Sequence, residues 1–354
     1  MTAALTSTDL DRPALRWRDG LLPTAIGWVW ARVCVGLGFA VANVMVDHLD
    51  TPRGDTQIHE GLFTWDGTYY RAIAEHWYHG IGEDSARFFP VYPALAKALG
   101  PVFGGHTDWA LLFISNVGAF LGAWILWRLA VEVCSTPASS GISAGTSAGP
   151  AGSGVGDAGW WTRFWATGPG SWSPGLDSVR ARGVGDRSAW LVAIFPSAFV
   201  LCFAYSEGLA LVLVAATLLA LHRRQFVIAG LLALVASAAR PVGGVLLVPI
   251  VIELIRFRPR TKLWDWIVGL GGPVAGLVLA MSWIERATGD LLLPVRLQRE
   301  LRGGFQDPVT RVLEPIGELF KGNFRDTYNL GFMVVLIALF LIAVLRRQPL
   351  SWLV

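Results

Sequence analysis

The chain has 354 residues, of which 53% are hydrophobic and only 16% are charged, and its formal net charge is +3. Soluble globular proteins carry about a quarter of charged residues, so this composition excludes an ordinary soluble domain and favours a protein within a bilayer. The small net charge comes from scattered arginines that form no basic stripe, which excludes nucleic acid as a partner.

The beginning of the chain does not have the pattern of a cleavable signal peptide. Residues 1–20 are polar and carry Arg12, Arg16 and Arg18, and the first apolar run begins only after them. The three cysteines lie in or at the end of apolar segments without CxxC spacing, so we expect buried thiols and no disulfide framework: Cys34, Cys134 and Cys202.

Long apolar segments predict an all-α, polytopic membrane protein with about 8–9 transmembrane helices, since a helix needs about 20 residues to cross the hydrocarbon core. The pair of segments that flanks Arg240-Pro241 is short and fits only a tight hairpin broken at that dipeptide. Segment 88–105 is also apolar, but prolines interrupt it, so we expect it at the membrane interface. The candidate spans are about 22–46, 109–133, 188–205, 207–222, 225–239, 242–256, 265–285 and 329–346.

Arginine-rich short loops predict the orientation of these spans. The loops "HRRQ" and "RFRPRTK", at 222–225 and 256–262, are expected in the cytoplasm together with the N-terminus. The longer loops 47–108 and 286–328 then lie on the extracytoplasmic side. The first of these loops is expected to contain a juxtamembrane helix.

A low-complexity segment divides the chain into two groups of helices. Residues 134–187 are largely Ser, Gly, Ala and Pro, which predicts a cytoplasmic linker between residues 1–133 and residues 188–354. The final residues "QPLSWLV" follow a pair of arginines and resemble the start of another helix. We therefore expect a chain that is cut short at its C-terminus.

The expected topology gathers unusual polar residues on the extracytoplasmic face. Asp66 lies in the first loop, Ser206-Glu207 lies where two spans meet, and Arg240 lies at the hairpin tip. The last loop adds Arg296, Gln298, Arg299 and Arg302. Ionisable groups at membrane depth are costly, so their convergence indicates a functional site.

Each of these residues also has a purely structural explanation. Asp66 is suited to cap a helix that begins near Thr68, and Ser206 is suited to cap the following span. Arg240 precedes a proline and fits an anchor at the membrane interface. The first loop also contains five histidines, but they lack metal-type spacing, so the sequence supports no metal site: His48, His59, His76, His79 and His106.

The helix expected after Asp66 has a polar stripe and an apolar face. Its stripe consists of Arg71, Glu75 and His79, and Tyr69, Ile73 and Trp77 form the opposing face. This pattern is typical of a helix that lies on a membrane with one side in water.

These residue types suit group transfer from a lipid-linked phosphate donor. A carboxylate such as Asp66 can accept a proton from an attacking hydroxyl, and arginines can bind a phosphate leaving group. Aromatic side chains can stack on sugar rings; the candidates are Trp65, Tyr69 and Tyr70. The sequence has neither a GxGxxG segment after a strand nor a Walker A motif, so a nucleotide-sugar donor has no support.

Four segments together resemble a known family. The sequence "WDGTYYRAIAEHWY", followed by "FFPVYPAL", is similar to the signature of the second mannosyltransferase of GPI-anchor synthesis and its bacterial relatives. "FPSAFVLCFAYSEGLAL" resembles that family's proline-containing segment with a Y-S-E motif, and "ASAARPVGGVLL" resembles its A-x-x-R-x-x-G segment. The matches follow the family's order over roughly residues 60–250, although the Gly/Ser-rich insert and the missing final helix with an arginine-tyrosine pair depart from its pattern.

The resemblance implies a C-type glycosyltransferase fold and an inverting transfer from a polyprenyl-phosphate sugar, expected to be mannose, to a glycolipid or envelope glycan. Asp66 is then the catalytic base, and no cofactor is required, while a metal remains open. Donor phosphate would contact Arg240, Arg296 and Arg299. Substrate would contact Trp65, Tyr69, Tyr70, Tyr205, Glu207 and Gln298.

Two other classes of protein remain compatible with the sequence. A lipid-phosphate carrier or flippase would also place arginines near a lipid headgroup but would need no base. A non-catalytic scaffold of an envelope-synthesis complex would fit a chain cut short at its C-terminus. A carrier should tolerate Asp66→Asn, and a scaffold should bind its partner without Asp66 and Arg240.

Overall fold

The structure, a computed structural model, describes residues 15–48, 57–135 and 176–301 and isolated residues between 317 and 341. The regular elements of these parts are all helical. The α-helices are α1 (Leu21–His48), α2 (Asp66–His76), α3 (Val91–Leu99), α4 (Thr107–Ser135), α6 (Ser178–Ile194), α7 (Glu207–His222), α8 (Phe226–Ala239), α9 (Leu247–Arg256), α10 (Leu263–Thr288) and α11 (Leu293–Leu301). Short 3-10 helices join them: η2 (Gln57–Phe63), η3 (Glu83–Arg87), η4 (Gly100–Phe103), η6 (Pro196–Leu201), η7 (Pro241–Leu246) and η8 (Arg258–Arg260).

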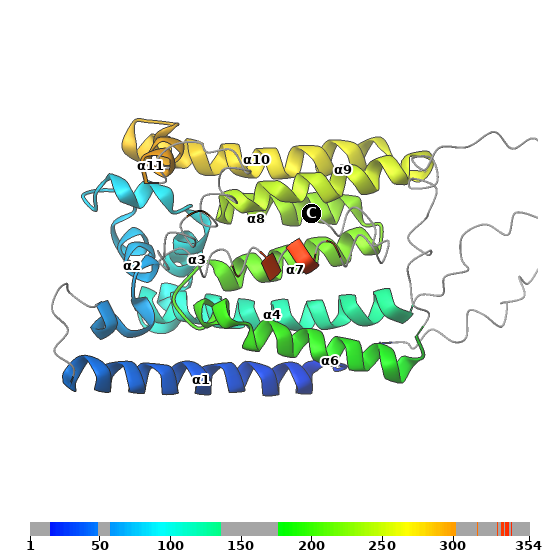
Figure 1. Cartoon of the computed structure of the whole chain (residues 1–354). Coiled ribbons are helices and arrows are strands. Elements are labelled where there is room, and N and C mark those ends of the chain that lie inside the picture. Colours follow the sequence, from blue (N-terminus) through cyan, green and yellow to red (C-terminus); the bar gives the residue numbers. More distant parts are fainter. Residues whose placement is uncertain are drawn as a thin grey trace, which may run out of the picture.

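The long helices run side by side, and three short helices gather at one end of them (Figure 1). Helices α2, α3 and α11 lie at this end, which we name the α2 end. The opposite end, which we name the arginine-rich end, contains the last turn of α4 and the turns that join α7 to α8 and α9 to α10. The chain therefore separates a compact cap of short helices from a bundle of apolar ones.

Three of the expected spans are confirmed as helices long and apolar enough to cross a membrane: Leu21–Val46, Thr107–Ser135 and Leu263–Thr288. The expected segments 207–222 and 225–239 form α7 and α8, which are apolar but shorter. Segment 88–105 forms the short α3 and η4 instead of one long helix, as its prolines predict. The expected span at 329–346 falls where the structure describes only isolated residues.

Two expected spans are wrong in their internal structure. The segment 188–205 is not one helix, because α6 ends at Ile194 and η6 follows from Pro196. Segment 242–256 begins with η7 after Pro241, and only Leu247–Arg256 is α-helical. In both segments a proline removes a backbone N–H and its ring obstructs the continuing α-helix.

The linker expected at 134–187 is shorter than its composition suggests. Helix α4 continues to Ser135, and α6 already begins at Ser178, where the side chain of Asp177 accepts a hydrogen bond from the N–H of Arg180. An N-cap of this kind stabilises a helix start by about 1 kcal/mol. The glycine-rich composition of this region had led us to predict a linker where α6 begins. The rest of the expected linker lies outside the described residues.

Glycines allow the central helices to approach closely. Gly118 of α4 faces Gly208 of α7, and a Cβ atom on Gly118 would lie 2.7 Å from the carbonyl carbon of Gly208. A Cβ on Gly208 would in turn collide with the backbone carbonyl of Ser115. Small residues at crossings of this kind are typical of helices packed within membranes.

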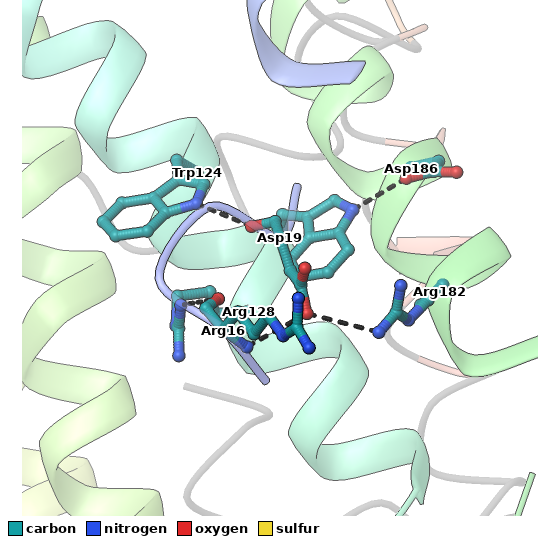
Figure 2. Close-up of polar contacts among 7 residues, drawn as sticks. Arg16, Asp19, Trp124, Arg128, Arg182 and Asp186 are labelled. Atoms are coloured by element: carbon teal, nitrogen blue, oxygen red, sulfur yellow. Dashed lines mark hydrogen bonds and ion pairs between the residues drawn. The ribbon is translucent and has the colours of Figure 1, made fainter. Parts of the chain in front are cut away.

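Hydrogen bonds secure the start of α1 at the arginine-rich end (Figure 2). The carboxylate of Asp19 accepts from the backbone N–H of Arg16 at 3.0 Å and from Arg182 of α6 at 3.2 Å. The carbonyl of Asp19 accepts from the indole of Trp124 at 2.9 Å, and Arg128 donates to the carbonyl of Arg16 at 3.1 Å. The segment before α1 is thus joined to both α4 and α6.

Candidate active site

Three distant segments of the chain meet at the α2 end. Helix α2 contributes Asp66 and Tyr70, and the junction of η6 with α7 contributes Ser206 and Glu207. Arg240 comes from the junction of α8 with η7, where its backbone is extended. The structure therefore brings together the first-loop acid, the Ser-Glu pair and the hairpin arginine that the sequence singled out.

A continuous polar network connects these segments. The hydroxyl groups of Tyr70 and Ser206 are 2.7 Å apart, and Arg240 donates from Nη1 to the Ser206 hydroxyl at 3.3 Å. Arg240 also forms an ion pair with the carboxylate of Glu207. Within the described parts of the chain, the second carboxylate oxygen of Glu207 is buried without a hydrogen-bond partner. Glu207 therefore has an unused acceptor inside the site.

The capping roles expected for Asp66 and Ser206 are wrong. Helix α2 begins at Asp66 itself, and its cap position, Trp65, makes no side-chain capping bond. Ser206 occupies the cap position of α7, but its hydroxyl makes no capping bond and contacts Tyr70 and Arg240 instead. The guanidinium of Arg240 forms an ion pair with Glu207. Polar contacts between segments have replaced local capping.

Asp66 is half-buried, and its carboxylate has no hydrogen bond or ion pair to any described residue. Burial raises the pKa of Asp66 above its ordinary value, and the negative charge of Glu207 raises this pKa further. The positive charges of Arg240 and Arg87 act in the opposite direction and lower the pKa of Asp66. The proton affinity of Asp66 is thus set first by burial and then by three charged neighbours.

Tyr70 supplies a buried and neutral hydroxyl to the network. Burial raises the pKa of Tyr70 far above neutrality, so its phenol keeps its proton. Its ring packs edge-on against Phe88 and Tyr92, with centroid distances of 5.1 Å and 4.8 Å. Tyr70 therefore has a fixed position and a structural role in holding Ser206.

Trp65 has an unusual backbone next to the candidate base. Its φ is +56° and its ψ is −113°, a conformation that non-glycine residues rarely adopt and that costs about 1–3 kcal/mol. The indole is 57% exposed and stacks on Phe203, with a centroid distance of 6.4 Å. Backbone strain of this kind concentrates at functional sites. The exposed indole of Trp65, beside the Asp66 carboxylate, is also available to stack on a sugar ring.

The other predicted aromatic residues lie close by with different surroundings. Tyr205 is buried and donates a hydrogen bond to the carbonyl of Thr64 at 2.8 Å, so it supports the turn that precedes Asp66. Tyr69 stacks on Phe88 with a centroid distance of 4.9 Å, and the guanidinium of Arg87 lies 5.7 Å from the centre of its ring. Tyr205 is buried and Tyr69 is half-buried, whereas Trp65 is 57% exposed, so Trp65 has the most accessible ring of the three.

Helix α11 lies at the same end but is not joined to this network by a polar contact among the described residues. Arg296 forms an ion pair with Asp290, while Arg299 is exposed and Gln298 is half-buried. Helix α11 packs beside η3, and Leu297 contacts the main apolar core. The position of Arg302 lies outside the described residues.

Sequence reasoning overlooked Arg87. Its side chain is 16% exposed, and its charge is one of those that lower the pKa of Asp66. It also lies beside Asp84, at 3.6 Å between Nε and Oδ1. The available signal was its place directly before "FFPVYPAL", at the boundary of the apolar segment 88–105.

The polar stripe expected on α2 is only partly correct. The helix ends at His76, and Trp77 takes a positive φ, so His79 and Trp77 are not on the helix. The buried side chains of α2 are Tyr70, Ile73 and Ala74, and Glu75 is exposed. In the described parts of the chain, no three His, Cys, Asp or Glu side chains are grouped for a metal ion.

Comparisons with known proteins add no relative to this picture. No protein-family model matches the chain, and neither a curated protein nor a solved structure matches it significantly.

Proposed function

We propose that the chain is a membrane glycosyltransferase that moves a sugar, expected to be mannose, from a polyprenyl-phosphate donor to a hydroxyl of a glycolipid or glycan. The observation that carries the proposal is the convergence of Asp66 with the Glu207–Arg240 pair at one end of an apolar bundle. The order of the four motifs and their similarity to the GPI mannosyltransferase II family support it independently.

Asp66 has the properties of a general base in this reaction. Its carboxylate is free of ion pairs among the described residues, and its raised pKa increases its affinity for a proton. The acceptor O–H gives its proton to Asp66 while the acceptor oxygen forms a bond to the anomeric carbon. The bond from that carbon to the phosphate oxygen breaks, and its electron pair leaves with polyprenyl phosphate.

Arg240 is the group best placed to bind the departing phosphate. Guanidinium groups match phosphate oxygens with paired donors, and the negative charge on the phosphate grows as the bond breaks. Arg240 is paired with Glu207 in the described structure, so the donor must share this cation or replace Glu207. Arg87 adds a second positive charge on the Asp66 side.

The remaining predicted residues are assigned to the substrates. Trp65 offers an exposed ring for the sugar, and Tyr69, Tyr70 and Tyr205 hold the walls around it. Helix α11 would have to move toward the polar network before its side chains could contact donor or acceptor. The side chains concerned are Arg296, Gln298 and Arg299. No metal is needed, because arginine can meet the charge of the leaving group.

We also propose that the chain crosses the membrane about eight to nine times, with its N-terminus in the cytoplasm. In this topology the shorter helices α7 and α8 are spans that end at the site, and η6 and η7 are broken segments protected by neighbouring helices. The α2 end then faces the extracytoplasmic side.

A transfer assay tests this function. Purified protein in nanodiscs is incubated with radiolabelled polyprenyl-phosphate mannose and a crude lipid–glycan extract, beside Asp66→Asn and the control Glu75→Gln. Glu75 is an exposed carboxylate on the same helix. We expect label in a glycan with the parent chain and the control, and none with Asp66→Asn. Donor binding without transfer in every form would contradict the proposal and favour a carrier or scaffold.

A further inference from the structure

An arginine lies within α1, at the middle of a helix long enough to cross a membrane. Arg32 forms its hydrogen bonds with neutral oxygens, and none of its contacts among the described residues is a carboxylate. Charged side chains within spans are costly and rarely retained without a role. Its signal in the sequence, a single charge within an apolar run, was overlooked.

Arg32 and Asn116 of α4 form a bidentate pair. The guanidinium donates from Nε at 3.0 Å and from Nη2 at 2.8 Å to the same side-chain oxygen of Asn116. Trp28 covers the pair: its ring centre lies 4.0 Å from the guanidinium, and its indole N–H donates to the carbonyl of Asn116 at 3.0 Å. The guanidinium group of Arg32 therefore has a fixed orientation between α1 and α4.

The free donors of this pair reach the end of η6. Arg32 donates from Nη2 to the carbonyl of Leu201 at 3.1 Å, and the amide of Asn116 donates to the carbonyl of Cys202 at 3.2 Å. Within the described chain, neither carbonyl accepts from a backbone N–H outside regular helices. A broken helix at membrane depth needs such partners, because no water is present to satisfy its carbonyls.

The residues directly after these carbonyls support both sides of the candidate site. The N–H of Ala204 donates to the carbonyl of Leu62 at 2.9 Å, and Tyr205 donates to the carbonyl of Thr64 at 2.8 Å. These two bonds hold the turn that leads into Asp66. Ser206 and Glu207 follow Tyr205 at once and meet Arg240.

We infer that Arg32 and Asn116 are positioning residues that fix the η6–α7 junction and thereby set the distance between Asp66 and the Glu207–Arg240 pair. The catalytic consequence rests on the proposed function, whereas the structural one does not. Lysine cannot replace Arg32, since one ammonium group cannot reproduce donors from two nitrogen atoms in a planar fork.

The reactivity of Cys202 measures the state of this junction directly. Cys202 is 3% exposed and follows Leu201, whereas Cys134 is 6% exposed and lies near the far end of α4. Release of the junction should expose only Cys202, and unfolding of the bundle should expose both thiols. Cys34 is exposed, and not buried as expected from the sequence, so every form that is labelled also carries Cys34→Ser.

The experiment compares N-ethylmaleimide labelling of the two thiols by mass spectrometry in the full-length protein in detergent. We expect Asn116→Leu and Arg32→Lys to raise the labelling rate of Cys202 by about tenfold or more while that of Cys134 stays unchanged. Arg128→Lys is the control, because Arg128 bonds a backbone carbonyl at the opposite end. Continued protection of Cys202 in both variants would overturn the inference, and so would equal exposure of both thiols.

A transfer assay then separates this inference from the proposed function. If the unsubstituted protein transfers sugar, Arg32→Lys and Asn116→Leu should lower kcat more than they raise the KM for the donor. The reason is that Asp66 and Arg240 would no longer be aligned with each other. If Cys202 is selectively exposed in the variants but no form transfers sugar, including the protein without these substitutions, Arg32 and Asn116 still fix the η6–α7 junction, and the proposed transferase function is rejected. Selective exposure with unchanged kcat would reject the positioning role.

Discussion

At the scale of single residues, Asp66 differs from the acids around it in having no cation of its own. Glu60 pairs with Arg71, and Glu207 pairs with Arg240, whereas Asp66 has no ion pair among the described residues. Its raised pKa means that the folded chain binds a proton more tightly than the unfolded chain does. Above that raised pKa the ionised carboxylate therefore lowers the stability of the fold.

Replacement of Asp66 by asparagine should abolish transfer without destabilising the protein. Loss of a general base lowers the rate by about 10²–10⁴-fold, while loss of a poorly solvated charge leaves the melting temperature at pH 7 equal or higher. The measurements are initial rates and thermal unfolding in detergent, with Glu75→Gln as control. A large fall in melting temperature would show that Asp66 is structural, and full activity would remove it as the base.

The charges beside Asp66 should shift its titration in opposite directions. Glu207 raises the pKa of Asp66 and Arg240 lowers it, so Glu207→Gln should move the titration to lower pH and Arg240→Gln should move it to higher pH. The carboxylic acid band in an infrared difference titration, assigned by its absence in Asp66→Asn, reports this pKa without an assay of activity. Shifts of the same sign in both variants would contradict the arrangement of charges.

At the scale of elements, the sequence predicted helices better than it predicted their interruptions. Apolar runs such as 22–46 and 265–285 are long enough to give a helix whatever surrounds them. The prediction of one helix over 188–205 was wrong, because Pro196 interrupts it and because Arg32 and Asn116 bind the carbonyls at the end of the 3-10 helix that follows. Such partners come from other helices and leave no local pattern.

The charged residues of the candidate site could be predicted from the sequence, but the contacts that join them could not. Asp66, Glu207 and Arg240 are conspicuous because each is a charge in an apolar or aromatic setting. The connecting role of Ser206 and the charge of Arg87 depend on tertiary contacts, so a single sequence does not reveal them. The placement of α11 likewise depends on packing against η3.

The crossing of α4 and α7 yields a prediction about stability. Gly208→Ala should destabilise the protein by about 1–3 kcal/mol, because its Cβ would collide with the backbone of Ser115 and neither helix can give way easily. Gly36→Ala on α1 is the matched control, since a Cβ there meets no atom within 4 Å. Thermal unfolding of both variants in detergent measures the difference, and equal melting temperatures would show that the helices cross less closely.

At the scale of the whole molecule, charge is distributed unequally between the two ends. Among the described residues, basic side chains outnumber acidic ones at the arginine-rich end, and acidic side chains are the more numerous at the α2 end. The basic residues concerned are Arg16, Arg18, Arg128, Arg180, Arg182, Arg187, Arg223, Arg224, Arg256, Arg258, Arg260 and Lys262. Since Lys and Arg in short loops remain in the cytoplasm, the α2 end should face outward.

Labelling of single cysteines in intact cells tests this orientation. In a chain whose three native cysteines are replaced by serine, His79→Cys marks the α2 end and Ser178→Cys marks the arginine-rich end; both positions are exposed, and neither change alters the Lys/Arg balance. A membrane-impermeant maleimide should label His79→Cys in intact cells and Ser178→Cys only after permeabilisation. The reverse pattern would place Asp66 in the cytoplasm. That result would reject an extracytoplasmic transferase, because the base would then lie on the cytoplasmic side.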